Sequence, residues 1–79
     1  MNDELLKANG FDAAILGIDY FDLENPRLIY SIKGCMEILR EEGDWESDDE
    51  ILEYINFNMT SAYVGKKTPI WCWDIEEIT

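Results

Sequence analysis

The chain has 79 residues and a formal net charge of -12, a length that allows one domain and a charge that marks an acidic protein. With 47% hydrophobic and 13% aromatic residues, it lies outside the low-hydrophobicity class that stays disordered. The longest apolar run is too short to cross a bilayer, and the N-terminus lacks the basic start of a secretory signal. We therefore expect a single cytoplasmic domain over residues 1–79, with no membrane association.

The N-terminal residues predict a short helix. Asn2 is a suitable N-cap, and Gly10 supplies a stop signal after Asn9. Leu5 and Leu6 would be the residues that this helix buries.

Two strands are expected next. The run from Ala13 to Phe21 is apolar and rich in residues that favour strands. Residues 22–26 have turn composition and end in proline, which disfavours a helix at the preceding residue. A second strand would follow from Arg27 to Tyr30.

Two consecutive helices are predicted after the strands, each with a serine as its N-cap. Ser31 would open a helix that ends at Gly43. Its apolar residues recur at the spacing of one buried stripe: Ile32, Cys35, Met36 and Leu39. Ser47 and Glu50 fit a capping box that opens a second helix, expected to stop near Gly65. That helix would bury Ile51, Leu52, Ile55, Met59, Ala62 and Tyr63.

A last strand over residues 70–73 completes the element order helix, strand, strand, helix, helix, strand. This order predicts an α+β fold: a small three-stranded antiparallel sheet with the helical pair packed on one face and a short N-terminal helix. Trp71 and Trp73 would point to one face of the sheet and Cys72 to the other. The face without the helical pair would then need cover from the first helix, a partner or a second copy.

The residue types present argue against catalysis. The chain has no histidine to serve as a general base, and it is too short to enclose a pocket easily. Cys35 and Cys72 lie in segments typical of buried helix and strand, without the neighbours that activate a thiolate. We expect reduced cysteines, no enzyme activity and no cofactor.

A built-in metal site is also disfavoured. Two separated cysteines without histidine cannot supply four zinc ligands. Asp44, Glu46 and Asp48 alternate as at the start of a calcium loop, but Asp49 stands where that loop needs glycine and Ile55 where it needs glutamate. Weak surface binding of a divalent cation is the alternative that this pattern leaves open.

The main clue is a run of eight carboxylates without a basic residue: Glu41, Glu42, Asp44, Glu46, Asp48, Asp49, Glu50 and Glu53. Capping accounts for Glu50, and the helix dipole favours Asp48 and Asp49 near a helix start. Such a surface opposes direct contact with nucleic acid or an anionic membrane. It could instead occupy a basic groove that normally binds phosphates, with a purely solubilising role as the alternative.

Trp45 lies inside this acidic run, at the turn between the two predicted helices. Its ring would be either folded back over the core or displayed to a partner as an anchor. The predicted partner-binding residues are Glu41, Glu42, Asp44, Trp45, Glu46, Asp48, Asp49 and Glu53. We interpret a further set of aromatic residues first as packing residues and second as interface residues: Trp71, Trp73, Tyr20, Tyr30, Tyr54 and Phe57.

Several phrases also resemble a group of short acidic proteins of unknown function encoded by tailed bacteriophages. They are Asp3-Glu4-Leu5-Leu6, Gly10-Phe11-Asp12-Ala13-Ala14-Ile15-Leu16-Gly17, Cys35-Met36-Glu37-Ile38-Leu39, and Ala62-Tyr63-Val64-Gly65 with Thr68-Pro69-Ile70. The chain departs from the group at Ile55-Asn56, where the group often has an acid. None of these phrases is a catalytic or ligand motif. The resemblance implies a phage context, in which small acidic proteins bind host enzymes and some inhibit nuclease-based defence by imitating nucleic acid.

Two hypotheses follow. The first is a non-enzymatic, phage-encoded inhibitor or modulator that binds a host protein with a basic surface, such as a nucleic-acid-binding enzyme. The second is a self-associating structural or adapter protein, for example a homodimer formed through the sheet aromatics, with no inhibitory role.

Overall fold

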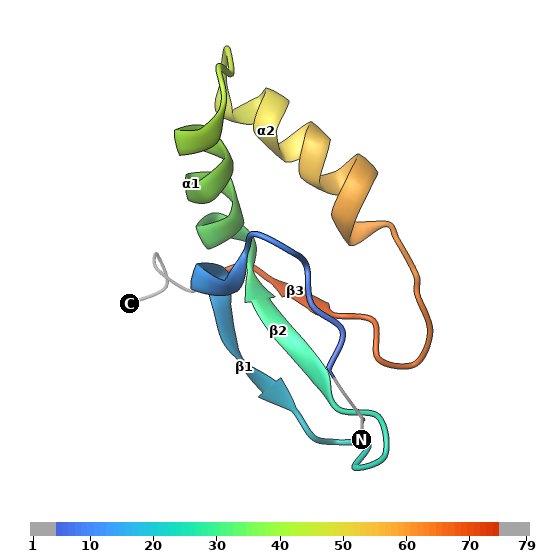
Figure 1. Ribbon diagram of the computed structural model, residues 1–79. Helices are drawn as coiled ribbons and strands as arrows, with labels where there is room; N and C mark the ends of the chain where they lie inside the picture. The colour runs from blue at the N-terminus through green and yellow to red at the C-terminus, as the bar shows by residue number, and fades with distance from the viewer. Residues whose placement is uncertain (1–4, 75–79) are drawn as a thin grey trace.

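The computed structural model describes residues 5–74 and confirms the α+β fold class (Figure 1). A three-stranded sheet, two α-helices and two irregular helical turns occur within that range. In chain order they are the 3-10 turn η1 (Asp12–Ala14), β1 (Ile15–Asp19), β2 (Arg27–Ser31), α1 (Ile32–Glu42), α2 (Asp48–Ile55), the wide π turn η2 (Asn56–Thr60) and β3 (Ile70–Cys72).

The sheet is mixed, so the prediction of a wholly antiparallel sheet was wrong. The central strand β2 pairs antiparallel with β1 and parallel with β3. The reason lies in the connection between β2 and β3. In Figure 1, α1 continues away from the end of β2 and α2 returns beside it, so the chain arrives at the end of the sheet where β2 begins. A crossover of this kind lets the next strand run parallel.

The predicted N-terminal helix is also wrong where it can be compared with the structure. Residues 5–8 have no regular structure, and the proposed cap, Asn2, lies outside the described residues. Leu5 packs against the core, whereas Leu6 is exposed. The backbone N–H of Ala8 donates to the Tyr30 hydroxyl at 2.8 Å. This segment is too short to be a stable helix by itself, and it gains more from contacts with the sheet.

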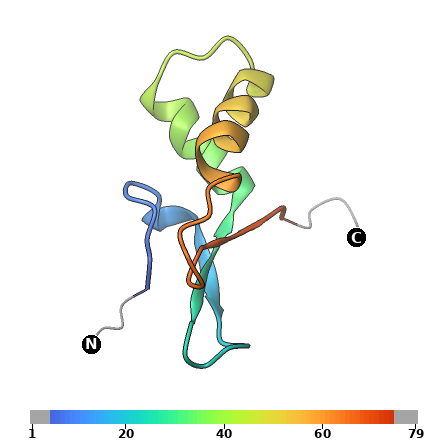
Figure 2. The same cartoon turned by 90° about the vertical axis from the view of Figure 1, so that its right-hand side faces the viewer.

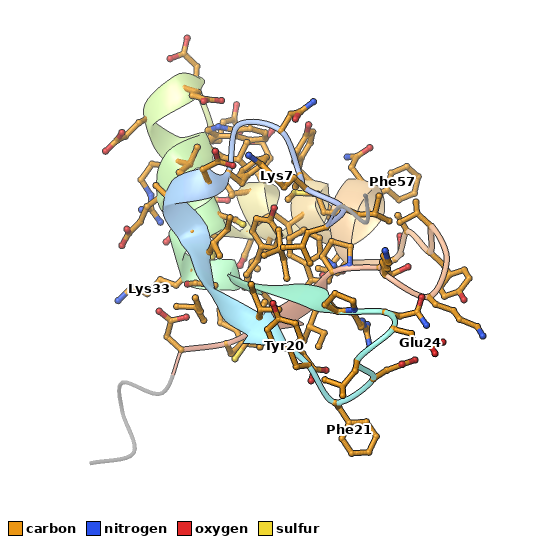
Figure 3. All side chains as sticks on the ribbon, turned by 60° about the horizontal axis from the view of Figure 1, so that its bottom comes forward. Lys7, Tyr20, Phe21, Glu24, Lys33 and Phe57 are labelled. Carbon is orange, nitrogen blue, oxygen red and sulfur yellow. The ribbon has the colours of Figure 1, made fainter. Side chains whose placement is uncertain are left out.

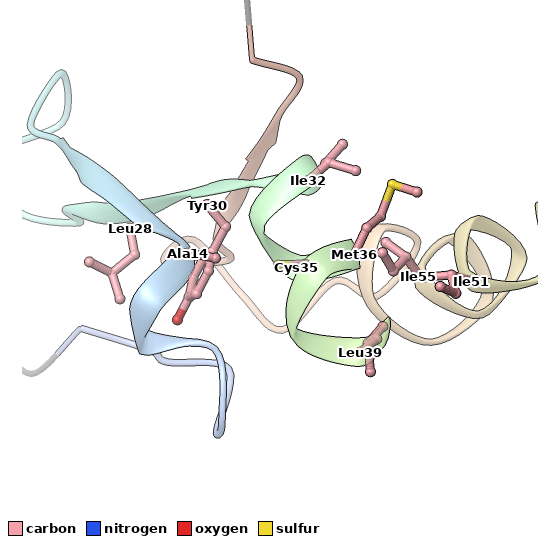
Figure 4. Packing of buried hydrophobic residues seen from close by; sticks show 9 residues of the cluster. All are labelled: Ala14, Leu28, Tyr30, Ile32, Cys35, Met36, Leu39, Ile51 and Ile55. Carbon is pink, nitrogen blue, oxygen red and sulfur yellow. The ribbon is translucent and has the colours of Figure 1, made fainter. Parts of the chain in front are cut away.

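The core runs from the sheet through α1 to α2 (Figure 4). All four residues of the predicted α1 stripe are buried, which confirms that prediction. They lie between Tyr30 of β2 on one side and Ile51 and Ile55 of α2 on the other. Tyr30, Cys35 and Ile55 are fully shielded from solvent. Burying one such side chain contributes about 1.5–3 kcal/mol, so this small cluster supplies most of the driving force for folding.

The helical segment that begins with α2 ends earlier than predicted, at Thr60 rather than near Gly65. Met59 still packs against the core, but Ala62 and Tyr63 are exposed. The chain must travel back to the start of β3, and extended residues cover about 3.3 Å each against 1.5 Å in a helix. The remaining residues therefore serve as a connection. Within it, buried Thr68 accepts a hydrogen bond from the Val64 N–H at 2.9 Å.

One face of the sheet has no described element packed on it. Ile29 lies opposite Gly17 and Ile70, so these residues share a face, and neither isoleucine belongs to the core cluster. Trp71 lies on the other face, with its ring stacked on Tyr30 at a centroid distance of 5.0 Å. The N-terminal segment contacts that same covered face through Ala8. Of the three kinds of cover considered for the open face, the first helix is therefore the one that the structure contradicts, and a partner or a second copy stay as predictions.

The molecule is elongated, with principal extents of 41 × 30 × 19 Å. Figure 2 shows the hairpin of α1 and α2 at one end and the turn between β1 and β2 at the other. Among residues 5–74, neither helix is both long and apolar enough to cross a membrane.

Ser31 joins three parts of the fold at the point where β2 becomes α1. Its buried hydroxyl oxygen accepts the N–H of Gly34 at 2.8 Å, as expected for an N-cap. The same hydroxyl donates to the carboxylate of Asp74 at 2.6 Å, just beyond β3. The cap therefore also ties the end of the last strand to the start of the first helix.

Replacement of the Ser31 hydroxyl should destabilise the fold. We expect Ser31→Ala to lower the free energy of unfolding by about 1–3 kcal/mol, because the Gly34 N–H and the Asp74 carboxylate both lose a partner. Urea unfolding followed by circular dichroism measures the change. Ser61→Ala is the matched control, since the Ser61 hydroxyl bonds only an exposed carbonyl. Equal stabilities of the two variants would contradict this role for Ser31.

Candidate partner-binding site at the helical hairpin

The predicted acidic residues come together at one end of the molecule. Glu41 and Glu42 form the last turn of α1, Asp44 and Glu46 lie in the turn, and the remaining four carboxylates lie on α2. All eight residues are exposed. The hairpin therefore carries all eight exposed carboxylates at one end of the molecule, and we call this end the acidic face.

The acidic face is nearly uncompensated. Among the described residues, only Asp48 of the eight pairs with a basic side chain, Arg40, at 3.0 Å. Asp48, Asp49 and Glu50 lie in the first turn of α2, where the helix dipole favours negative charge. Glu41 and Glu42 lie in the C-terminal turn of α1, where the helix dipole disfavours negative charge. Those two charges work against the stability of their own helix.

The start of α2 follows the capping prediction in part. The Ser47 hydroxyl accepts the N–H of Glu50, at a long 3.4 Å. The Glu50 carboxylate accepts the backbone N–H of Glu46 at 2.8 Å, which is one residue earlier than in a capping box. Glu50 thus braces the turn, and its carboxylate has a structural role.

Trp45 is folded back and half-buried. Its indole N–H donates to the carbonyl of Leu39 at 2.7 Å, and its ring meets Tyr54 edge-on at a centroid distance of 5.5 Å. Gly43 makes room for this arrangement, because a Cβ there would lie 3.0 Å from the indole nitrogen. The side chain locks the hairpin turn, so it is a structural wedge as well as part of the surface.

A groove of about 550 Å³ lies beside the acidic face. Three aromatic residues line it, Trp45, Tyr54 and Phe57, together with the carboxylates Glu50 and Glu53. Polar side chains complete its lining: Asn56, Asn58 and Ser61. The volume is within the range of about 300–1,000 Å³ that is typical of ligand sites.

The residues Tyr54 and Phe57 were not predicted to form a site. With Glu50 and Glu53 they follow the α-helical spacing i, i+3, i+4 and i+7, and all four line the groove although Phe57 lies in η2. This stripe is out of phase with Ile51 and Ile55, the buried pair. The sequence already showed that Tyr54 and Phe57 are out of phase with the buried stripe, but the sequence interpretation put packing first for them and an interface role second.

The π turn η2 shapes the far end of this groove. The Asn58 side chain donates to the Tyr54 carbonyl at 3.0 Å, and the Ser61 hydroxyl donates to the Phe57 carbonyl at 3.2 Å. These bonds hold the side chains of Asn58 and Ser61 against the backbone of the helical segment. Phe57 projects outward from the turn, as Figure 3 shows, and 83% of it is exposed.

Other kinds of chemistry find little support in the described part of the chain. No group of three or more metal-ligating side chains there is arranged to hold an ion, so Asp44, Glu46 and Asp48 do not converge. Both cysteines are free thiols. Burial raises the pKa of Cys35 to about 11, so this thiol stays protonated and weakly nucleophilic at neutral pH.

Comparisons with known proteins do not assign the chain to a family. No protein-family model, curated protein or solved structure matches the chain.

The close packing of Trp45 against Gly43 can be tested by adding a methyl group at Gly43. We expect Gly43→Ala to displace the Trp45 ring and weaken its bond to Leu39, with a loss of about 0.5–1.5 kcal/mol in stability. The indole N–H resonance of Trp45 should move in a ¹H–¹⁵N spectrum. Gly17→Ala is the control, because a Cβ at Gly17 meets nothing within 4 Å. An unchanged indole resonance in Gly43→Ala would refute the close contact.

Proposed function

We propose that this chain is a non-enzymatic, phage-encoded binding protein that inhibits or modulates a host protein. Its acidic face would occupy a basic surface that normally holds nucleic acid, as in the enzymes of nuclease-based defence. The observation that carries the proposal is the display of eight exposed carboxylates on one hairpin, of which only Asp48 has a basic partner among residues 5–74.

Electrostatics gives this surface a clear preference of partner. A dense patch of one charge attracts the opposite charge over several ångströms and accelerates encounter. A nucleic-acid-binding protein carries clustered Lys and Arg side chains that neutralise phosphates. Carboxylates displayed at similar density can engage the same cluster, and binding should then weaken steeply as salt screens it.

The placement of Glu41 and Glu42 supports a use for the charge beyond solubility. Solubility requires charge anywhere on the surface. These two residues lie where the dipole of α1 disfavours them, next to further acids and without a described basic partner. A partner that supplies basic groups would relieve that repulsion.

Two parts of the proposal rest on other grounds. The non-enzymatic role is supported by the absence of histidine from the sequence and by the buried, protonated Cys35. The phage context rests on the sequence resemblance alone, because the comparisons gave no match.

The decisive experiment removes charge without disturbing the fold. A variant with Glu41→Gln and Glu42→Gln has the same net charge as Glu24→Lys, which changes an exposed acid in the turn at the opposite end of the molecule. Tagged protein captures its target from a bacterial host lysate at low salt, and the purified target is then titrated. We expect the double variant to bind roughly 2- to 30-fold more weakly, at about 0.2–1 kcal/mol for each charge. Glu24→Lys should bind as the unaltered chain does.

The same purified target decides between mimicry and ordinary docking. The chain should displace a labelled oligonucleotide from it, and its affinity should fall with increasing salt. Equal binding by the double variant and the unaltered chain would sink the acidic-face mechanism. Binding without displacement of nucleic acid would sink the mimicry.

Self-association is the second candidate, and the open face of the sheet is the observation that favours it. Leu16 of β1 is 57% exposed, and Ile29 and Ile70 lie on that open face. Apolar side chains that remain accessible on a sheet can serve as an interface. In this case the mass from light scattering should rise with concentration, and Leu16→Lys should hold the chain at the mass of one copy. A constant single-copy mass for the unaltered chain would rule this candidate out.

A further inference from the structure

We propose that the groove formed by Trp45, Tyr54 and Phe57 seats one arginine side chain of the protein partner, with Glu50 and Glu53 beside its guanidinium group. This inference rests on the proposed function, because it names the partner side chain that the acidic end recognises. It adds a specific contact to an attraction that charge alone would make diffuse.

The aromatic rings provide the first argument. Phe57 is 83% exposed and Tyr54 is 41% exposed, so both present ring surface to an incoming group. A cation over such rings is attracted by the negative charge of the ring faces, and arginine is the side chain most often found there. Exposed rings that line one groove are also typical anchors of a binding surface.

The carboxylates show which occupant complements the groove. Glu53 has no basic partner among residues 5–74, and one oxygen of Glu50 accepts the N–H of Glu46. An anion would be repelled at this place, and an apolar side chain would leave the carboxylates without partners. A cation satisfies both the rings and the acids.

The polar rim favours donors on the partner. Asn58 and Ser61 donate their own hydrogen atoms to the carbonyls of Tyr54 and Phe57. The Ser61 hydroxyl has no further hydrogen to donate, so its oxygen can only accept, and the Asn58 side chain keeps an accepting oxygen beside its second N–H group. Arginine carries five N–H donors on a plane that stacks on rings and forks toward carboxylates, whereas lysine is a compact point charge. The mixture of rings and acceptors thus fits arginine better.

The groove is held in shape before binding. The bond from Trp45 to the Leu39 carbonyl fixes one wall, and the edge-on contact with Tyr54 joins that wall to α2. The bonds of η2 hold the end from which Phe57 projects. Binding therefore requires little ordering of the protein, which favours affinity.

The test uses the full chain and a small probe in place of the unknown target. The probe is the capped pentapeptide Lys-Gly-Arg-Gly-Lys, and its comparator has citrulline, the neutral isostere, in place of arginine. Titration is followed in ¹H–¹⁵N spectra. We expect saturable shifts centred on the Trp45 indole and the Phe57 amide. The unaltered chain should bind the citrulline peptide about two- to five-fold more weakly than the arginine peptide. The variant Phe57→Ala should bind the arginine peptide more weakly than the unaltered chain does, by about the same factor.

Phe21→Ala is the matched control. Phe21 is 96% exposed and projects from the turn between β1 and β2, well away from Phe57 in Figure 3. Both substitutions remove an exposed ring, so both variants should fold as the unaltered chain does. Glu53→Gln is a second variant. It should lower the affinity for the arginine peptide more than the affinity for the citrulline peptide.

The outcomes separate this inference from the proposed function. If Phe57→Ala and Phe21→Ala bind the arginine peptide equally, or if citrulline binds as well as arginine, the arginine seat is wrong. In that event the double variant at Glu41 and Glu42 still tests whether the acidic face binds the target. If that double variant leaves target binding intact, the acidic-face mechanism fails, and the comparison of the arginine and citrulline peptides remains the separate test of the arginine seat.

Discussion

Tyr30 is the residue on which the rest of this small fold depends. It lies at the middle of the sheet and is fully shielded from solvent. Its ring stacks on Trp71 of β3, its backbone lies opposite Ile15 of β1, and its hydroxyl accepts the N–H of Ala8. Through its side chain and its backbone, this one residue thus joins three segments: β3, residues near Ala8, and β1. A chain of this length buries only about 60–65% of its unfolded surface, so a single well-packed centre carries much of the stability.

That centre also places the candidate site. β2 leads through Ser31 directly into α1, and α1 projects beyond the end of the sheet (Figure 1). The hairpin turn is therefore held away from the sheet, and its carboxylates lie far from the sheet's core. Trp45 then closes the turn against Leu39. The acidic face is consequently mounted on a braced support, which a flexible loop would not provide, and a braced surface loses less entropy on binding.

The features predictable from sequence were those determined by neighbouring residues. The α1 stripe, the Ser31 cap and the positions of β2 and β3 follow from periodicity and capping, which act over a few residues. The direction of β3 and the extended path of residues 5–8 depend on partners far along the chain, such as Tyr30 for Ala8. At the site, the acidic run was evident from composition. The groove was not, because its existence depends on the phase of Tyr54 and Phe57 relative to Ile51 and Ile55.

The eight carboxylates are not equivalent once their places in the hairpin are known. Asp48 has Arg40, Glu50 holds the Glu46 N–H, and Asp49 gains from the start of α2. Glu41 and Glu42 gain nothing of this kind and oppose the dipole of α1. A surface serving solubility alone would have no reason to concentrate charge at that pole. Charge at this pole weakens its own helix, so under the proposed function Glu41 and Glu42 are the two carboxylates that best separate a partner-binding surface from a solubilising one.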